Sequence, residues 1–205
     1  MGKAIGIDLG TTNSVVAFKD TAVKVIQTGA NNEDLCRSCV ALDKSGQFLV
    51  GNSVYKNWKR YSPNIVVSVK RLMGTAFSEY QVQKMRADSK AYPFGIKKPL
   101  GGTSEAVSIV LRGKEYSPEF ISGEILKSLK RDAATKLGDV THAVITVPAY
   151  VTEKQKTATK KAAELAGLRV QRLLAEPTAA AISYGFDKMV PGESKQVLVY
   201  DFGGG

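Results

Sequence analysis

Near its start the chain reads Ile7-Asp8-Leu9-Gly10-Thr11-Thr12, an apolar strand that ends in an aspartate and a turn of small residues. A second copy of this pattern, Tyr200-Asp201-Phe202-Gly203-Gly204-Gly205, ends the chain. Such a strand end suits a carboxylate that holds a metal ion beside backbone N–H groups that face phosphate. A tight hairpin with a capping aspartate would explain one copy, but two copies favour a duplicated nucleotide site. We expect the second half of this site to be truncated.

Length and composition predict a globular protein. The chain has 205 residues, 43% of them apolar, which is enough for one large domain or two small ones. The longest apolar stretch, Ala143 to Val151, is far shorter than the roughly 20 residues of a membrane helix. Residues 1–3 lead directly into a strand pattern without a secretory signal. We therefore expect a cytoplasmic protein with no membrane partner.

The net charge of +10, from 29 basic and 19 acidic residues, raises the question of nucleic-acid binding. The basic residues are scattered in small clusters, and no recognition motif accompanies them. This pattern favours a solvated basic surface and predicts no nucleic-acid partner.

The segment Cys36-Arg37-Ser38-Cys39 has the spacing of a redox pair or of half a zinc site. Zinc needs four ligands, and His142 is the only histidine. A thioredoxin-like pair would begin a helix, whereas the residues after Cys39 read as a strand. We predict two ordinary cysteines and a histidine that starts a strand instead of acting as a base.

Hydrophobic patterning predicts an α/β architecture. Three β-rich runs at the start, residues 4–9, 14–18 and 22–26, predict an antiparallel meander. Residues 29–114 are irregular, with an expected hairpin at 44–46, a short helix at 53–59, a segment at 65–72 and a strand at 106–111. The expected elements that follow are a helix from Pro118 capped by Ser117, a doubly buried strand at 143–147, a helix capped by Thr152, a strand at 170–174, a helix at 178–184 and a strand at 196–200. This order gives a mixed sheet covered by helices.

The phosphate-binding motif is neither a P-loop nor a dinucleotide fingerprint, because the sequence lacks both glycine patterns. Phosphates would instead be held by β-turns. Mg²⁺ keeps several waters when only one or two carboxylates approach it. Asp8, Glu176 and Asp201 are the candidate carboxylates.

Four segments together resemble one family, the nucleotide-binding domain of the seventy-kilodalton heat-shock (DnaK-type) chaperones of the stress response. They are Ile5 to Ser14, Val69 to Gly74, Ile145 to Tyr150 and Ala175 to Ala181. The resemblance implies the two-lobed actin-like ATPase (ribonuclease H-like) fold, with a mixed five-stranded sheet and an inserted smaller α+β subdomain in lobe I. It implies subdomain IA at 1–35 and 115–190, subdomain IB at 36–114, and a truncated start of lobe II at 191–205. Asn13 also resembles the bacterial branch.

The resemblance also implies ligands and residue roles. The ligands are ATP or ADP with Mg²⁺, and K⁺ as a further ion. Lys70 would reach the γ-phosphate and position the attacking water, and Asp8 would hold water-bridged Mg²⁺. Glu176 and Asp201 would organise metal-bound water, with Asp201 as proton acceptor. The two phosphate loops would be Gly10, Thr11, Thr12 and Asn13, and Gly203, Gly204 and Gly205.

The family further implies a relay between the nucleotide site and a peptide-binding domain. Pro148 and the residue eight positions later, here Lys156, match the relay, and Arg172 lies where the surface for other domains and co-chaperones is expected. The lysine lacks the planar fork of the family's arginine.

The parent protein would be an ATPase that gates peptide binding for protein folding, with unfolded peptides, a J-domain co-chaperone and a nucleotide exchange factor as partners. The chain alone is expected to be inactive. Two alternatives are a small-metabolite kinase of the same superfamily and a non-catalytic actin-like assembly module.

Overall fold

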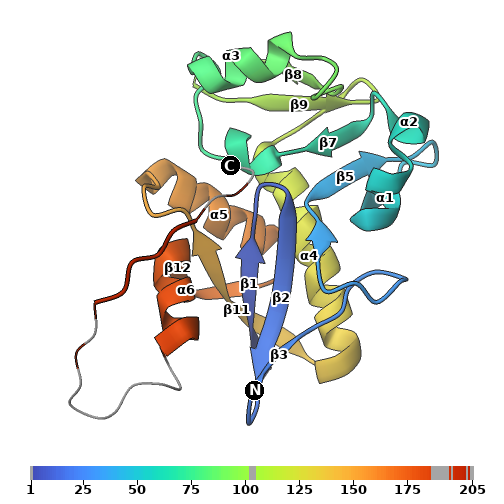
Figure 1. Ribbon diagram of the computed structural model, residues 1–205. Helices are drawn as coiled ribbons and strands as arrows, with labels where there is room; N and C mark the ends of the chain where they lie inside the picture. Colours follow the sequence, from blue (N-terminus) through green and yellow to red (C-terminus); the bar gives the residue numbers. More distant parts are fainter. Residues whose placement is uncertain (1, 102–104, 186–193, 195, 202, 204–205) are drawn as a thin grey trace.

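A mixed sheet forms the centre of the molecule (Figure 1). The computed structural model describes residues 2–101, 105–185, 194, 196–201 and 203. The strand order is β12-β11-β1-β2-β3, and β4 pairs with β2 beside this path. The strands are β1 (Lys3–Leu9), β2 (Asn13–Lys19), β3 (Val23–Val25), β4 (Cys36–Arg37), β11 (Val140–Val147) and β12 (Arg169–Ala175). The predicted mixed sheet is confirmed, with five strands along the main path and the short β4 as a sixth strand beside it.

The predicted meander is confirmed, because β1, β2 and β3 pair antiparallel in sequence order. Buried and exposed residues alternate along β1, so the two faces of the sheet differ. Ile5, Ile7 and Leu9 are at most 3% exposed, whereas Gly6 and Asp8 between them are exposed. One face therefore belongs to the core, and the other is open.

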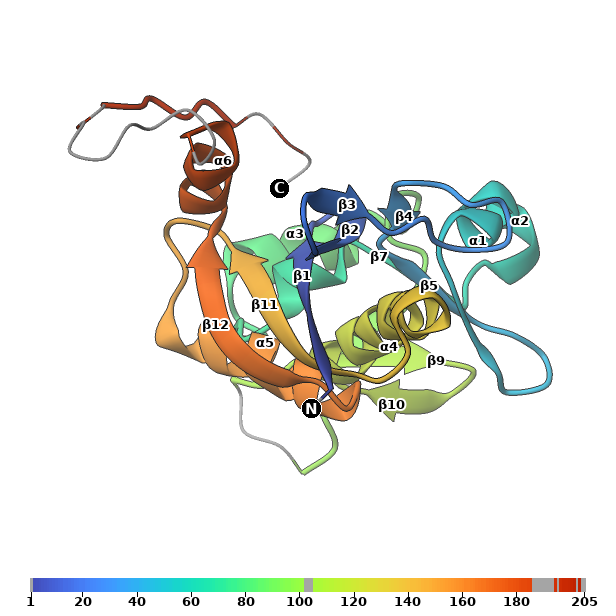
Figure 2. The same cartoon turned by 90° about the horizontal axis from the view of Figure 1, so that it is seen from below.

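Three helices cover the sheet. Helices α4 (Pro118–Leu137) and α5 (Glu153–Leu165) lie on its apolar face, and α6 (Glu176–Gly185) lies on the opposite side (Figure 2). The Ser117 hydroxyl accepts a hydrogen bond from the Phe120 N–H at 3.1 Å, and Thr152 forms a capping box with Gln155. Both predicted caps are confirmed. In the described ranges, none of the helices has the length and apolar content needed to cross a membrane.

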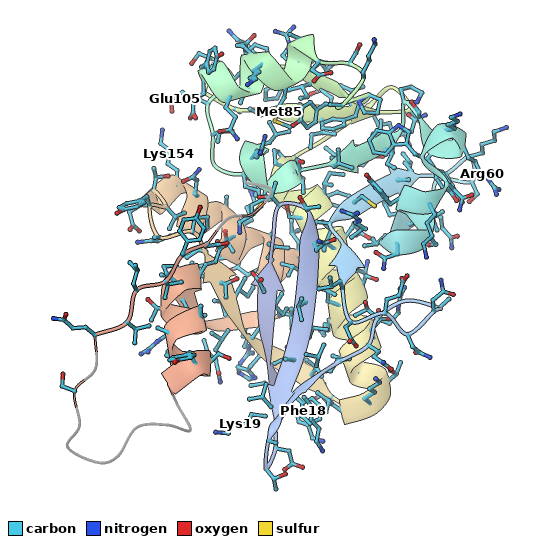
Figure 3. The ribbon with its side chains drawn as sticks, viewed as in Figure 1. Phe18, Lys19, Arg60, Met85, Glu105 and Lys154 are labelled. Carbon is cyan, nitrogen blue, oxygen red and sulfur yellow. The ribbon has the colours of Figure 1, made fainter. Side chains whose placement is uncertain are left out.

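The inserted segment contains two small antiparallel sheets, with orders β6-β5-β7 and β10-β9-β8. The elements are β5 (Cys39–Leu42), β6 (Phe48–Val50), α1 (Asn52–Lys56), α2 (Trp58–Tyr61), β7 (Ile65–Val67), η1 (Val69–Leu72), α3 (Tyr80–Ala87), β8 (Gly95–Lys97), β9 (Ser108–Leu111) and β10 (Lys114–Tyr116). The hairpin is confirmed, since Asp43 Oδ1 accepts hydrogen bonds from the N–H groups of Ser45 and Gln47 at 2.8 and 2.9 Å. An ion pair between Glu105 and Lys154 at 2.8 Å ties this segment to α5 (Figure 3).

Within this segment, the single short helix expected at 53–59 is wrong. Asn57 adopts φ −107° and ψ 32° and separates α1 from α2. Its side-chain amide donates to the Ser53 carbonyl at 2.8 Å, so an asparagine competes with the helical backbone here. Helix α3 was not predicted, because only Val82 and Met85 in it are buried and its apolar residues do not recur clearly at helical spacing.

Two strand predictions are also corrected. Strand β11 is not buried on both faces, because it alternates between buried and half-buried residues, and Val144 and Thr146 line an open cavity. Residues 196–200 form no strand. Leu198 and Tyr200 are 94% and 86% exposed, and in the described part of the chain no strand pairs with this segment. A strand needs a hydrogen-bonding neighbour, which explains the difference.

Candidate functional site

The carboxyl ends of three parallel strands meet at one edge of the sheet. The register pairs Ile7 with Ile145, and Val147 with Ala175. Asp8 in β1, Thr146 in β11 and Glu176 after β12 consequently lie near the same edge. Open α/β sheets bind ligands at this position.

A cavity of about 870 Å³ lies at this edge, between the open face of the sheet, the turn after β1, η1 and α6. Most of the predicted site residues line it. They are Asp8, Gly10, Thr11, Thr12, Asn13, Lys70, Pro148, Glu176, Asp201 and Gly203. Gly204 and Gly205 lie outside the described residues. The structure thus brings together side chains from both ends of the chain.

The Asp8 carboxylate is held in place by Thr146. The Thr146 hydroxyl donates a hydrogen bond of 2.6 Å to Asp8 Oδ1. Asp8 is exposed and lines the cavity, so its carboxylate oxygens can accept further hydrogen bonds there. Thr146 was not predicted as a site residue. Its position at the end of a strand, two residues before Pro148, is the signal that could have identified it.

The turn at residues 10–13 is anchored from behind by Ser38. The Ser38 hydroxyl donates to the Gly10 carbonyl at 2.8 Å, and the Ser38 N–H donates to the Thr12 carbonyl at 2.9 Å. Ser38 Oγ also lies 2.9 Å from Ser14 Oγ in a buried contact. In the described part of the chain, no protein group accepts a hydrogen bond from the N–H of Thr11 or Thr12. The turn therefore presents free donors beside the cavity.

Lys70 reaches the cavity from the inserted segment. It lies in η1, where Val69 and Leu72 are 2% and 1% exposed and anchor the turn. Lys70 Nζ lies 2.6 Å from Glu176 Oε1, and the two side chains are 17% and 25% exposed. This contact joins residues 106 positions apart and places a cation and an anion at the cavity wall.

The carboxylates do not form a direct metal cluster. Among the residues that the structure describes, no group of three His, Cys, Asp or Glu side chains could hold an ion. Asp8, Glu176 and Asp201 nevertheless line one cavity. This donor set fits an ion that keeps most of its water ligands, as Mg²⁺ commonly does.

The three residues with an expected regulatory role are not gathered in one place. Pro148 is exposed and lines the cavity. Lys156 lies in α5, where its Nζ is 2.7 Å from Glu153 Oε1, and it does not line the cavity. Arg172 is exposed on β12, the edge strand of the sheet.

The two cysteines are buried and not bonded to each other. Burial raises the pKa of the Cys36 thiol to about 11 and that of Cys39 to about 12. Cys39 Sγ donates to the Gly51 carbonyl at 3.2 Å. This environment agrees with two structural cysteines.

We expect neither cysteine to react with iodoacetamide in the folded protein at about pH 8, because both raised pKa values keep the thiol protonated there. Mass spectrometry should find two adducts in urea and none without it. The variant Ser89→Cys, at an exposed position, is the positive control. Rapid native labelling of Cys36 or Cys39 would contradict the structural reading.

Comparison with known proteins matches residues 4–205 to the Hsp70 protein family. The chain belongs to the Hsp70 family. Over its full length it is 40% identical to "Chaperone protein DnaK 3" of a Synechococcus species and 40% identical to "Chaperone protein dnaK1" of Synechococcus elongatus. The chain spans 30% of the length of each of these Hsp70 relatives.

Membership in the Hsp70 family, which consists of ATP-binding chaperones, confirms two expectations. The sheet order and its small antiparallel companions are those of the actin-like lobe I. The family also implies nucleotide binding.

Proposed function

We propose that this Hsp70 chain forms the phosphate-binding half of a Mg-ATP site in a DnaK-type chaperone. The contact between Lys70 and Glu176 carries the proposal, because it brings a lysine of the inserted segment to the same cavity as Asp8 and the turn at 10–13. Family membership favours this function over a metabolite kinase or an actin-like assembly module.

Each residue has a proposed part in holding the triphosphate. The free N–H groups of Thr11 and Thr12, with Gly10 and Asn13 in the same turn, bind phosphate oxygens. Lys70 leaves Glu176 for the terminal phosphate, where it offsets charge that develops during hydrolysis. Gly203, Gly204 and Gly205 begin the second phosphate loop.

Mg²⁺ would neutralise phosphate charge in this site, and K⁺ is a further candidate ion. Asp8 would face the ion through water, since Thr146 already occupies one of its oxygens. Glu176 and Asp201 orient the attacking water, and Asp201 accepts its proton.

Further proposals concern the whole protein. ATP hydrolysis would gate the binding of unfolded peptides, with a J-domain co-chaperone and a nucleotide exchange factor as partners. Pro148 and Lys156 would relay the nucleotide state, and Arg172 would contact other domains. The setting would be a bacterial-type cytoplasm, as suits relatives from Synechococcus. The proposed division is subdomain IA at 1–35 and 115–190, IB at 36–114, and lobe II from 191.

Calorimetric titration with Mg-ATP tests the site. Asp8→Ala should weaken binding at least about tenfold, because a charged hydrogen-bonding group is worth roughly 1.5 to 3 kcal/mol. Asp20→Ala, an exposed aspartate at the far end of β2, should leave the affinity unchanged. Inorganic tripolyphosphate with Mg²⁺ serves as a second probe that isolates the phosphate contacts. No saturable binding of either probe, or equal affinities for the two variants, would refute the proposal.

A further inference from the structure

A second cavity of about 500 Å³ lies beside the turn at residues 10–13, on the side of Ser38. It shares Thr11 and Thr12 with the first cavity, and its other walls come from the β4–β5 connection, α1, α2, the end of β7 and Ala91. Figure 1 shows these elements grouped at the edge of the inserted segment, away from α6. Its volume is within the range of small-molecule sites.

Arg37 supplies this cavity with an unneutralised cation. Its guanidinium carbon lies 4.4 Å from the centroid of the Tyr55 ring. In the described part of the chain no carboxylate pairs with it, whereas the nearby Lys56 is paired with Glu33 at 3.0 Å. The Arg37 N–H donates to the Asn52 side chain at 2.7 Å, which fixes the backbone. The guanidinium donors are therefore available to an anion.

Two aromatic side chains supply a surface for a flat ring. Tyr55 from α1 and Trp58 from α2 both line the cavity, with centroids 5.9 Å apart and planes at 75°. Cys39 and Val67 contribute apolar side chains to the wall of the cavity. A few polar groups among aromatic and apolar side chains are typical of a small-molecule site.

We propose that this cavity binds a small planar aromatic anion, with the ring against Tyr55 and Trp58 and the acidic group on Arg37. An aromatic ring can stack on the exposed Tyr55, which is 43% accessible. The Thr12 hydroxyl, also in the cavity wall, can donate to the same acidic group. The site shares Thr11 and Thr12 with the turn that faces the first cavity, but it does not use Asp8, Lys70 or Glu176, so the two binding sites can be tested separately.

The test uses 2-naphthalenesulfonate as the probe. Trp58 is the only tryptophan, so its indole N–H gives a single, site-specific NMR signal. We expect a saturable shift of this signal with a dissociation constant of roughly 1 mM or tighter, from the usual binding energy per ligand atom. Arg37→Gln should weaken the sulfonate about tenfold. The neutral analogue 2-naphthalenemethanol should bind wild type and Arg37→Gln equally.

Matched variants keep the result interpretable. Arg60→Gln is the charge control, because Arg60 points outward from α2 and does not line the cavity (Figure 3). It should leave the affinity unchanged. Tyr55→Leu should weaken both probes. No saturable shift of the Trp58 signal, or equal affinities for Arg37→Gln and Arg60→Gln, would overturn the proposal.

Discussion

Replacing Gly74 with alanine will lower the free energy of unfolding by roughly 2 to 5 kcal/mol. Gly74 follows η1 and has φ +64°. A Cβ atom there would lie 2.7 Å from the backbone of Lys154 and Gln155 at the start of α5. Because the opposing atoms are backbone, a rotamer change cannot relieve the contact. The substitution must therefore push η1 and α5 apart.

Urea unfolding measures this effect, and Gly29→Ala is the matched control. Gly29 has φ +67°, almost the same angle, but a Cβ atom there would meet nothing within 4 Å. In the control, the free energy of unfolding should fall only by the cost of placing alanine in a left-handed backbone conformation, about 1 to 2 kcal/mol. Equal losses in the two variants would show that the approach of η1 to α5 contributes nothing to stability.

This close approach also matters for the site. Lys70 lies on η1, and its position over the cavity depends on how η1 packs. Glycine at position 74 was part of the motif from Val69 to Gly74 that carried the family resemblance. The structure supplies the physical reason for that glycine, which the motif alone did not give.

The sequence predicted those parts of the fold whose signals are local. Helix α4 has an N-cap at Ser117, proline at its first position and apolar residues at helical spacing, all within one segment. The inserted segment was predicted less well, because its elements are short and are stabilised by contacts from elsewhere. Residues 196–200 carried a strand pattern, but pairing depends on a neighbour that the pattern cannot reveal.

The candidate site shows the same division. The pattern that ends β1 identified Asp8 and the turn from the sequence. Glu176 was already a candidate carboxylate, whereas the family resemblance identified Lys70. The contact between those two joins residues 106 positions apart, so no local pattern could predict it. Thr146 and Ser38 were missed because their roles depend on hydrogen bonds across strands, to Asp8 and to the turn.

The second large effect is expected at Gly10, where alanine should cost about 3 kcal/mol of stability and distort the phosphate turn. A Cβ atom at Gly10 would lie 2.1 Å from the Asn13 carbonyl oxygen. The turn must open to admit it, which strains the bonds from Ser38 to the Gly10 and Thr12 carbonyls. The N–H groups of Thr11 and Thr12 would move with it.

Gly6→Ala is the control that separates this clash from the loss of a glycine. Gly6 lies four residues earlier on β1 and lines the same cavity, but its nearest neighbour for a Cβ atom is the Ala17 carbonyl oxygen at 3.8 Å, an ordinary contact. Urea unfolding of both variants should show a loss at Gly10 and almost none at Gly6. Mg-ATP affinity should fall only for Gly10→Ala. If Gly10→Ala were as stable as Gly6→Ala, the turn would be adaptable, and a rigid arrangement of free N–H donors could not explain phosphate binding.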